Sequence, residues 1–275
     1  MCTLAVLLNV YPSYPLVVVA NRDEEFGRPS APPTFREGPV RVLSPTDLLR
    51  GGAWIAVNES PLFVGLTNRK GIPSVPGLRS RGELVADAAK APTLDQALAS
   101  VMGRDRAAYN GFHMIISDDE VTFLAVGNGS GQPDADGDVI TPGFSFAPLH
   151  DGLNIATNLG LGAGTPRGNA IVHSWDALKT YGLPPPRATL FNRLLTWHDV
   201  EKPSSGTHGR RYDSICLHAT PEEPDYGTVS STFIRLEKPG AAPKAWQYWH
   251  GAREKVPTAQ CSISWSSMMT LPVAA

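Results

Sequence analysis

The chain opens with MCTLAVLLNVYPSYPLVVVANRDEEFGRP (residues 1–29), in which two apolar runs, 3–10 and 16–20, flank a proline-containing turn. Short runs rich in branched aliphatic residues and closed by turn residues predict a β-hairpin. The first run has no basic segment before it and prolines interrupt the stretch. It is also too short to span a bilayer, so we expect neither a signal peptide nor a membrane anchor.

The rest of the chain alternates short apolar runs with Gly and Pro. Strands are predicted at residues 53–57, 62–67, 112–116, 121–126, 152–157, 212–218, 228–236 and 245–248. Capping boxes at Ser80–Glu83 and Thr93–Gln96 predict one helix pair, and Thr165 and Arg187 begin a second. Many strands with two separate helix pairs predict an α+β layered protein, and no linker divides it. We therefore expect a single domain over residues 1–275.

Composition excludes several classes of partner. The 275 residues are 42% apolar and carry a formal charge of −2, which gives no field that would attract nucleic acid or an anionic membrane. The three cysteines have no metal-ligand spacing, and an odd number suits a reducing compartment. We expect a cytoplasmic protein with no metal and no cofactor.

Cys2 is the first candidate for chemistry. A small residue at this position favours removal of Met1, which would leave a cysteine with a free α-amino group. That amine, with a pKa near ~8 in model peptides, can accept the proton of its own thiol. The alternative is a buried cysteine that opens a core strand, and from Cys2 alone this alternative is favoured.

Charged and amide side chains crowd the end of the second predicted strand, in the run Asn21-Arg22-Asp23-Glu24. If the strand continues, Arg22 and Asp23 point to opposite faces; if it bends there, they reach one site. A carboxylate would hold a terminal ammonium, and an arginine would lower the pKa of a thiol. A solvated turn would explain the charge, but not the specific sequence around it.

These motifs resemble the NRDE family, which includes the transport and Golgi organisation proteins of eukaryotes. The resemblance begins with Met1-Cys2-Thr3, Ala20–Glu24 and Arg28-Pro29. It continues in the family's order through residues 51–54 (GGAW), 66–68 (LTN), 81–85 (RGELV), 109–112 (YNGF) and 226–228 (YGT). Together these blocks cover most of the chain.

The family is in turn similar to N-terminal nucleophile hydrolases, especially the bile salt hydrolase and penicillin V acylase group. This resemblance implies a four-layer αββα sandwich with Cys2 as nucleophile between the sheets. It assigns Arg22 and Asp23 as partners of the amine and thiol, and Asn68 and Asn158 as oxyanion or amine donors. From the same motifs we predict that substrate contacts come from Asn21, Glu24, Tyr109 and Asn110.

The chain departs from the hydrolase group at one place. That group has an arginine late in the chain, where Thr232 stands here, and close NRDE relatives often have one where Val229 stands. Arg167, Arg210 or Arg211 could take its place in space.

Two functions from different classes follow from the resemblance. The first is hydrolysis of a non-peptide amide (C–N) bond in a small molecule through Cys2. The second is an inactive relative that binds or traffics haem or a lipid, because the family is linked to Golgi organisation, haem trafficking and lipid handling. A shared fold does not choose between them.

Overall fold

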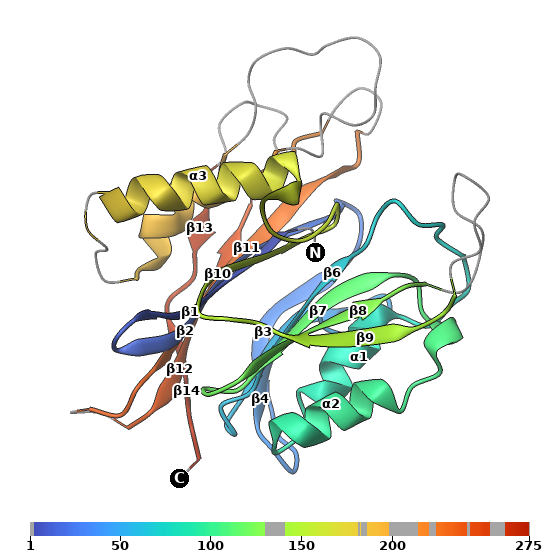
Figure 1. The fold of residues 1–275 in the computed structure, drawn as a ribbon, viewed down its shortest axis with the longest axis horizontal. Helices are drawn as coiled ribbons and strands as arrows, with labels where there is room; N and C mark the ends of the chain where they lie inside the picture. The colour runs from blue at the N-terminus through green and yellow to red at the C-terminus, as the bar shows by residue number, and fades with distance from the viewer. Residues whose placement is uncertain are drawn as a thin grey trace.

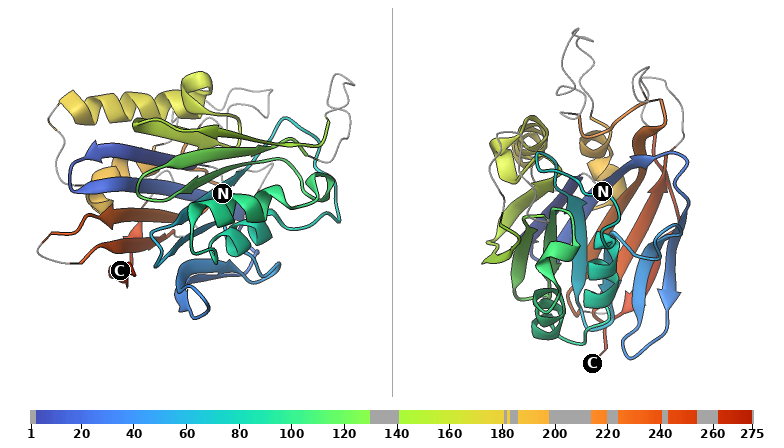
Figure 2. Two further views of the ribbon diagram at one scale, coloured as in Figure 1. Left: turned by 60° about the horizontal axis from the view of Figure 1, so that its bottom comes forward. Right: turned by 90° about the vertical axis from the view of Figure 1, so that its right-hand side faces the viewer.

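Two β-sheets pack face to face in the computed structural model, and helices cover their outer sides (Figure 1). The structure describes residues 3–129, 141–180, 182, 186–197, 214–219, 224–240, 243–253 and 262–274. Within these residues each sheet has seven strands, and the paired strands are antiparallel. The order helix, sheet, sheet, helix is visible in two further views (Figure 2) and confirms the predicted αββα sandwich.

The first sheet has the predicted N-terminal hairpin near its centre. Its strands are, in spatial order, β10 (Gly152–Thr157), β1 (Thr3–Tyr11), β2 (Tyr14–Glu25), β11 (Tyr226–Glu237) and β12 (Ala245–Ala252), with β13 (Ser264–Trp265) and β14 (Met269–Pro272) both pairing with β12. Strand β2 continues past the predicted end at Ala20 to Glu25. The motif 21–24 is therefore strand and not a turn.

The second sheet follows chain order. Its strands are β3 (Ser30–Arg36), β4 (Val42–Asp47), β5 (Ile55–Asn58), β6 (Phe63–Asn68), β7 (Phe112–Ser117), β8 (Thr122–Gly127) and β9 (Phe144–Pro148). The sequence did not predict β3, β4 or β9. Strands β3 and β9 are sheet edges, and β3 contains a register shift where Pro32 and Pro33 stand. Proline and irregular pairing are tolerated at edges, and they remove the alternation that identifies a strand.

Helices cover the two outer faces. Next to the second sheet lie α1 (Arg81–Ala88) and α2 (Leu94–Met102), followed by the short η1 (Arg106–Ala108). Next to the first sheet lie α3 (Pro166–Thr180), η3 (Ala188–Phe191) and α4 (Asn192–Leu195), with η2 (Gly162–Gly164) before α3. The predicted N-caps form, because Ser80 accepts from the Gly82 amide and Thr93 from the Gln96 amide.

Alternation along β1 divides its side chains between two cores. Leu4, Val6 and Leu8 belong to the core between the sheets. Ala5 and Leu7 belong to the core under α3, η3 and α4. Side chains two residues apart on a strand share a face, so this division tells which layer each functional residue of β1, β2 and β10 faces.

Two predicted elements differ from the structure. The strand predicted at 212–218 is wrong for its described part, because residues 214–219 form no strand. This segment instead forms hydrogen bonds with the start of β11. The Leu217 amide donates to Thr228 Oγ1, and the Thr228 amide donates to the Leu217 carbonyl. The helix predicted at 187–197 is a 3₁₀ turn followed by four α-helical residues.

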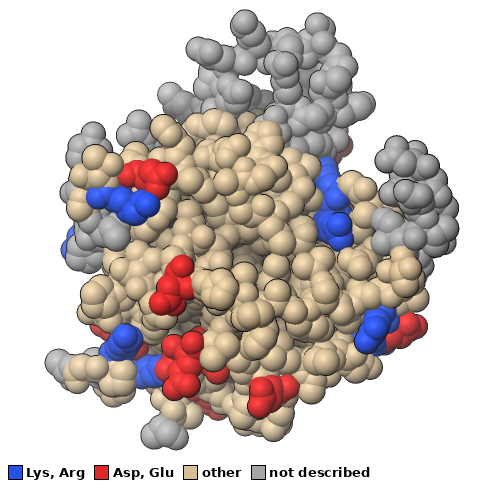
Figure 3. Space-filling model, viewed as in Figure 1, with Lys and Arg blue, Asp and Glu red and all other residues tan. Residues whose placement is uncertain are grey.

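Surface charge and helix length bear on the partners that the protein can have. Charges of both signs are scattered over the face seen in Figure 3, with no patch of a single sign. Among the described residues, no helix has the length and apolarity that crossing a bilayer requires.

Candidate functional site

Three strand ends meet where the chain begins. Thr3 pairs with Asn21 of β2 on one side and with Thr157 of β10 on the other. Cys2 lies outside the described residues, immediately before Thr3 in the chain. The candidate site is therefore built from its surroundings, which are the ends of β2 and β10 and the neighbouring strands.

Arg22 and Asp23 point to opposite faces of the first sheet. Asp23 faces the helices, where it accepts hydrogen bonds from Thr228 Oγ1 at 2.7 Å and Arg167 Nη1 at 3.1 Å. The Arg22 guanidinium lies 4.3 Å from the ring centre of Trp54, toward the second sheet. Of the two arrangements that the sequence left open, the continuing strand is correct, and the two side chains do not converge on one site.

Arg167 fastens helix α3 to the start of β1. Neither it nor Asp23 has any exposed side-chain surface, and Arg167 Nη1 also donates to Thr3 Oγ1 at 3.1 Å. Arg167 was one candidate for the missing late arginine, but it lies on the helix-facing side of the sheet. The other two candidates, Arg210 and Arg211, lie outside the described residues.

Asn21 also faces the helices, and its carboxamide is fully engaged. Its Nδ2 donates to the carbonyl oxygens of Leu195 and Ile215, at 2.8 and 2.9 Å. Its Oδ1 accepts from Ser231 at 2.6 Å and from Arg253 at 3.2 Å. The structure thus places the Asn21 side chain on the helix side of the sheet. There it holds α4 and the segment 214–219 against β2.

Arg253, at the end of β12, is a residue that the sequence analysis missed. It donates to Ser231 Oγ at 2.8 Å and to the Leu195 carbonyl at 2.9 Å. Burial lowers the pKa of Arg253 to about 10, while the charge of Asp23 opposes this shift. No motif marks this position, because its partners come from distant parts of the chain.

Cys216 lies beside Arg253, with Nη1 3.5 Å from Sγ. Cys216 is part of a disulfide, whereas the odd number of cysteines favoured a reducing compartment. His218 Nε2 is 4.0 Å from the same sulfur, which has no proton to give while it is part of a disulfide, so the two residues do not form a Cys–His dyad.

Asn158 immediately follows β10, at the end of the sheet where the Thr157 carbonyl meets His113 of the other sheet. The residue is fully buried, and neither atom of its carboxamide finds a hydrogen-bond partner in the described part of the chain. An unsatisfied buried amide costs about 1–3 kcal/mol, so this one is a candidate for binding something else.

Two histidines lie near this end of the sheets. His113 Nδ1 is 3.0 Å from the Thr157 carbonyl oxygen, and burial lowers the pKa of its ring. His250, on the same face of β12 as the core residue Tyr248, has its pKa lowered to about 4 by burial and by the charge of Arg22. Both rings are therefore neutral at pH 7.

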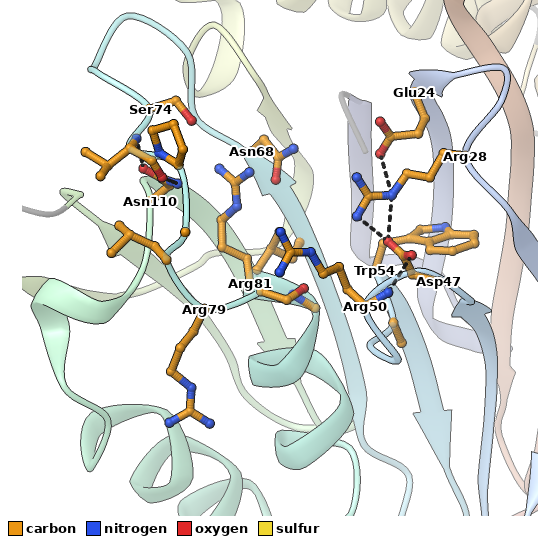
Figure 4. Close-up of a pocket in the computed structure, with 18 of the residues that line it drawn as sticks. Glu24, Arg28, Asp47, Arg50, Trp54, Asn68, Ser74, Arg79, Arg81 and Asn110 are labelled. Carbon is orange, nitrogen blue, oxygen red and sulfur yellow. Dashed lines mark hydrogen bonds and ion pairs between the residues drawn. The ribbon is translucent and has the colours of Figure 1, made fainter.

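A cavity of about 350 Å³ opens beyond Arg22, between the end of β2, the strands β5 and β6, and the start of α1 (Figure 4). Arg22, Glu24, Trp54, Asn68 and Asn110 are among its lining residues. It therefore brings together four of the predicted site residues. Asn21, Asp23, Tyr109 and Asn158 do not line it.

One wall of the cavity is an ion-pair network. Arg28 Nη2 lies 2.6 Å from Asp47 Oδ2, and its Nε lies 3.7 Å from Glu24 Oε2. Glu24 also pairs with Arg22 at 3.5 Å. Burial alone would raise the pKa of Asp47, but the hydrogen bond and charge of Arg28 outweigh it and lower that pKa.

The opposite wall is a loop that Asn110 holds in place. Its carboxamide accepts from the Val75 amide at 2.8 Å and donates to the Val75 carbonyl at 2.9 Å. Tyr109 packs instead in the core beneath α1 and α2. Asn110 therefore shapes the cavity, and Tyr109 supports the sheet behind it.

Two family motifs meet at this cavity. The carbonyl of Gly82 accepts from the Ala53 amide at 3.1 Å, which joins the start of α1 to the turn before β5. A Cβ on Gly52 would lie 2.5 Å from the carbonyl carbon of Gly82. The two glycines are needed because the backbones touch here.

The part of the chain that the structure describes contains no set of side chains that could bind a metal ion. No three His, Cys, Asp or Glu side chains gather there closely enough to hold an ion.

Comparisons with known proteins agree with the fold and the motifs. The family model described as Transport and Golgi organisation 2 matches residues 1–159. The Transport and Golgi organization 2 homolog of Mus musculus is 31% identical over 109 residues, which are 38% of this chain and 40% of that protein. The Homo sapiens homolog is 30% identical over 140 residues, 48% of this chain and 49% of that protein. The match thus spans at most about half the length of these relatives.

A solved structure extends the similarity to the whole chain. A single-residue variant of conjugated bile acid hydrolase from Clostridium perfringens superposes with a TM-score of 0.55 and 12% identity. The superposition covers 99% of this chain and 97% of that one. At this identity the comparison shows a shared fold, that of the N-terminal nucleophile hydrolases.

Proposed function

Because this chain belongs to the Transport and Golgi organisation 2 family and has the fold of an N-terminal nucleophile hydrolase, we propose that it hydrolyses a non-peptide amide bond through Cys2. The substrate is a small molecule. The observation that carries the proposal is the buried carboxamide of Asn158, next to the end of β10, for which the described residues provide no hydrogen-bond partner.

The pairing around Thr3 supports a role for Cys2. Thr3 lies opposite Asn21 and Thr157, so continuing the same register by one residue would put position 2 between Arg22 and Asn158. Alternation would turn that side chain toward the second sheet, because Thr3 contacts Arg167 on the helix side. The thiol would then lie beside a cation that lowers its pKa and an amide that can donate.

The proposed reaction uses Cys2 as nucleophile and base. After removal of Met1, the free α-amine accepts the thiol proton, and the sulfur forms a bond to the amide carbonyl carbon. Asn158 Nδ2 donates to the resulting oxyanion. When the C–N bond breaks, the α-ammonium returns the proton to the leaving nitrogen. Water then attacks the thioester, its proton passes through the amine to the sulfur, and a carboxylic acid leaves.

The other predicted residues take different parts in this proposal. Asp23 acts as a positioning residue, because its contacts with Arg167 and Thr228 hold the strand ends that flank Cys2. Asn68, which lines the cavity at the end of β6, contacts the bound substrate. Glu24 holds Arg22 and Arg28 by ion pairs and acts on the substrate through them.

The experiment combines mass spectrometry with turnover. Under reducing conditions, so that the thiol is free, the intact protein should lack Met1. It should gain the mass of an acyl group when mixed with a cleavable member of a panel of N-acyl amides. Cys2→Ala should abolish both acylation and turnover, while Cys261→Ala, which removes a thiol elsewhere in the chain, should not.

Two results would contradict this proposal. One is turnover that survives in Cys2→Ala. The other is a wild-type protein that retains Met1 and forms no acyl-enzyme with any amide tested. The second result would favour the non-catalytic alternative, a protein that binds haem or an acyl compound, which a haem titration followed by absorbance would then examine.

A further inference from the structure

The second sheet and the loop after β6 hold the two residues at the end of β10. His113 Nδ1 on β7 is 3.0 Å from the Thr157 carbonyl oxygen, and Thr67 Oγ1 on β6 is 3.4 Å from the same oxygen. The Lys70 amide, two residues after β6, donates to the Asn158 carbonyl at 2.7 Å. We call these three donors, from Thr67, Lys70 and His113, the β10 clamp.

The clamp determines which nitrogen of His113 carries the proton. A carbonyl oxygen only accepts, so Nδ1 must be the donor to Thr157. Burial lowers the pKa of the His113 ring, although the bond to Thr157 opposes this, and the ring is therefore neutral at pH 7. A neutral imidazole has a single N–H group. That proton is on Nδ1, and Nε2 has a lone pair.

The clamp fixes the backbone on both sides of Asn158. A peptide group is planar, so a hydrogen bond that holds the Thr157 oxygen also holds the nitrogen and Cα of Asn158. The bond from Lys70 holds the next peptide plane, at the Asn158 oxygen. With both planes held, the direction of the Asn158 Cα–Cβ bond is set, and the side-chain torsions are the freedom that remains.

The clamp lies beside the start of β1. Thr3 pairs with Thr157 across β1 and β10. Thr67 and His113 are cross-strand neighbours on β6 and β7, and both reach the Thr157 carbonyl. The clamp therefore joins the two sheets at the end of the sandwich where the proposed function expects the nucleophile.

We propose that His113 is a positioning residue, which holds the Asn158 carboxamide in place through the Thr157 carbonyl. This inference rests on the proposed function, in which that carboxamide donates to the oxyanion. The bond from His113, at 3.0 Å, is shorter than the 3.4 Å bond from Thr67, so the loss of His113 should displace Asn158 further. A displacement on the order of 1 Å can lower a rate by about 10²-fold.

Three variants separate the hydrogen bond of His113 from its volume. His113→Asn keeps a donor near the position of Nδ1, His113→Gln moves the donor to the position of Nε2, and His113→Leu removes it. His250→Leu is the matched control. His250 lies at the same end of the sheets, and its buried Nδ1 has no hydrogen-bond partner within the described residues.

Nuclear magnetic resonance tests the clamp without turnover. With isotopically labelled histidine, the His113 signals should be those of the neutral Nδ1–H tautomer. With labelled asparagine, the side-chain signals of Asn158 are identified by their loss in Asn158→Ala. They should move in His113→Leu and His113→Gln and stay closer to the wild type in His113→Asn. All three variants lose the ring current, so a difference between them reports the hydrogen bond.

Kinetics tests the consequence for the reaction. For the N-acyl amide that the wild-type protein cleaves, His113→Leu should lower kcat by about tenfold to 10²-fold and change KM little, because the oxyanion forms only after the substrate has bound. His113→Asn should recover most of this loss, and His250→Leu should keep the wild-type kcat. The concentration of active sites is titrated by acylation of Cys2, so a loss of folded protein does not count as a loss of kcat.

The inference is overturned if the neutral ring carries its proton on Nε2, or if His113→Leu has the kcat of the wild type. Asn158 signals that are the same in His113→Leu and His113→Asn would also overturn it. Failure of the hydrolase proposal gives a different pattern, in which the tautomer and the Asn158 signals are as expected and the wild-type protein forms no acyl-enzyme on Cys2.

Discussion

The carboxylate of Asp23 and the guanidinium of Arg167 form an ion pair that is closed off from solvent, with Nη1 3.1 Å from Oδ2. One residue belongs to the β2 motif and the other to the first turn of α3. A second contact, from Arg167 to Thr3, makes this pair the link between the helix layer and the start of the chain. A substitution in this pair should therefore also alter the geometry of the candidate site, through the contact with Thr3.

Removing one partner of this pair should destabilise the protein strongly. Arg167→Ala leaves the buried Asp23 without its cation, a change that costs about 3–5 kcal/mol in comparable buried pairs. The free energy of unfolding, measured by denaturant titration, should fall by this amount. Lys179→Ala, which breaks an exposed pair with Asp176 on the same helix, should cost no more than about 1 kcal/mol. An Arg167→Ala loss as small as that of the control would show that the pair is not buried as described.

A substitution at Asn158 should lower turnover without lowering the free energy of unfolding. Its carboxamide makes no hydrogen bond within the described residues, so Asn158→Ala should leave the free energy of unfolding unchanged or raise it. Turnover should fall by about 10²–10³ if the amide donates to the oxyanion. A variant that is less stable but fully active would assign Asn158 to the core and not to the reaction.

Asn58 provides the matched control for that experiment. It is also a buried asparagine, but it donates to the carbonyls of Ala89 and Ala91 and accepts from the amides of Ser60 and Leu62. Asn58→Ala should therefore lower the free energy of unfolding by several kcal/mol, because four backbone groups, three of them buried, lose their partner.

His250 should make stability depend on pH. Burial and Arg22 lower its pKa in the folded protein to about 4, whereas the unfolded chain has a histidine pKa near ~6.5. Between pH ~6.5 and 4, the His250 ring is protonated in the unfolded state but stays neutral in the folded state. Stability present above pH ~6.5 is therefore lost as the pH falls toward 4, by up to about 3 kcal/mol.

The measurement is denaturant unfolding at several pH values between 4 and 8. His250→Phe should remove much of the slope between pH 4 and 6.5, and the part that remains includes His113, whose pKa is also lowered by burial. His150→Phe, at an exposed position just before β10, should leave the slope in place. An unchanged slope in His250→Phe would contradict the neutral, buried state of this ring.

Gly52 should not tolerate a side chain. In Gly52→Ala the new Cβ would meet the carbonyl carbon of Gly82 at 2.5 Å, so either α1 or the turn before β5 must move. We expect a loss of about 1–3 kcal/mol in the free energy of unfolding, together with weaker binding in the cavity. Gly27→Ala has no heavy atom within 4 Å of its Cβ and should be close to neutral. Equal effects of the two substitutions would contradict the close contact at Gly52.

The sequence by itself determined the local structure and the family. Apolar runs with turn residues between them located most strands, including residues 152–157 without error. The N-caps of α1 and α2 could be predicted directly, because a capping hydroxyl and the amide that donates to it are two or three residues apart. The ordered motifs identified the family and, through it, the sandwich. The edge strand β3 was missed, because proline and irregular pairing hide its alternation.

The tertiary structure decided what the motif residues do. Alternation separates Arg22 from Asp23, but whether the strand continued there depended on its pairing with β11. Arg167 reaches Asp23 from 144 residues away, and Arg253 reaches Asn21 from 232 residues away. Asn158 is distinguished only by its surroundings, because none of the described residues satisfies its carboxamide. Local sequence fixes the period of a strand, whereas the neighbours of a side chain are set by which strands and helices pack against it, and those come from the whole chain.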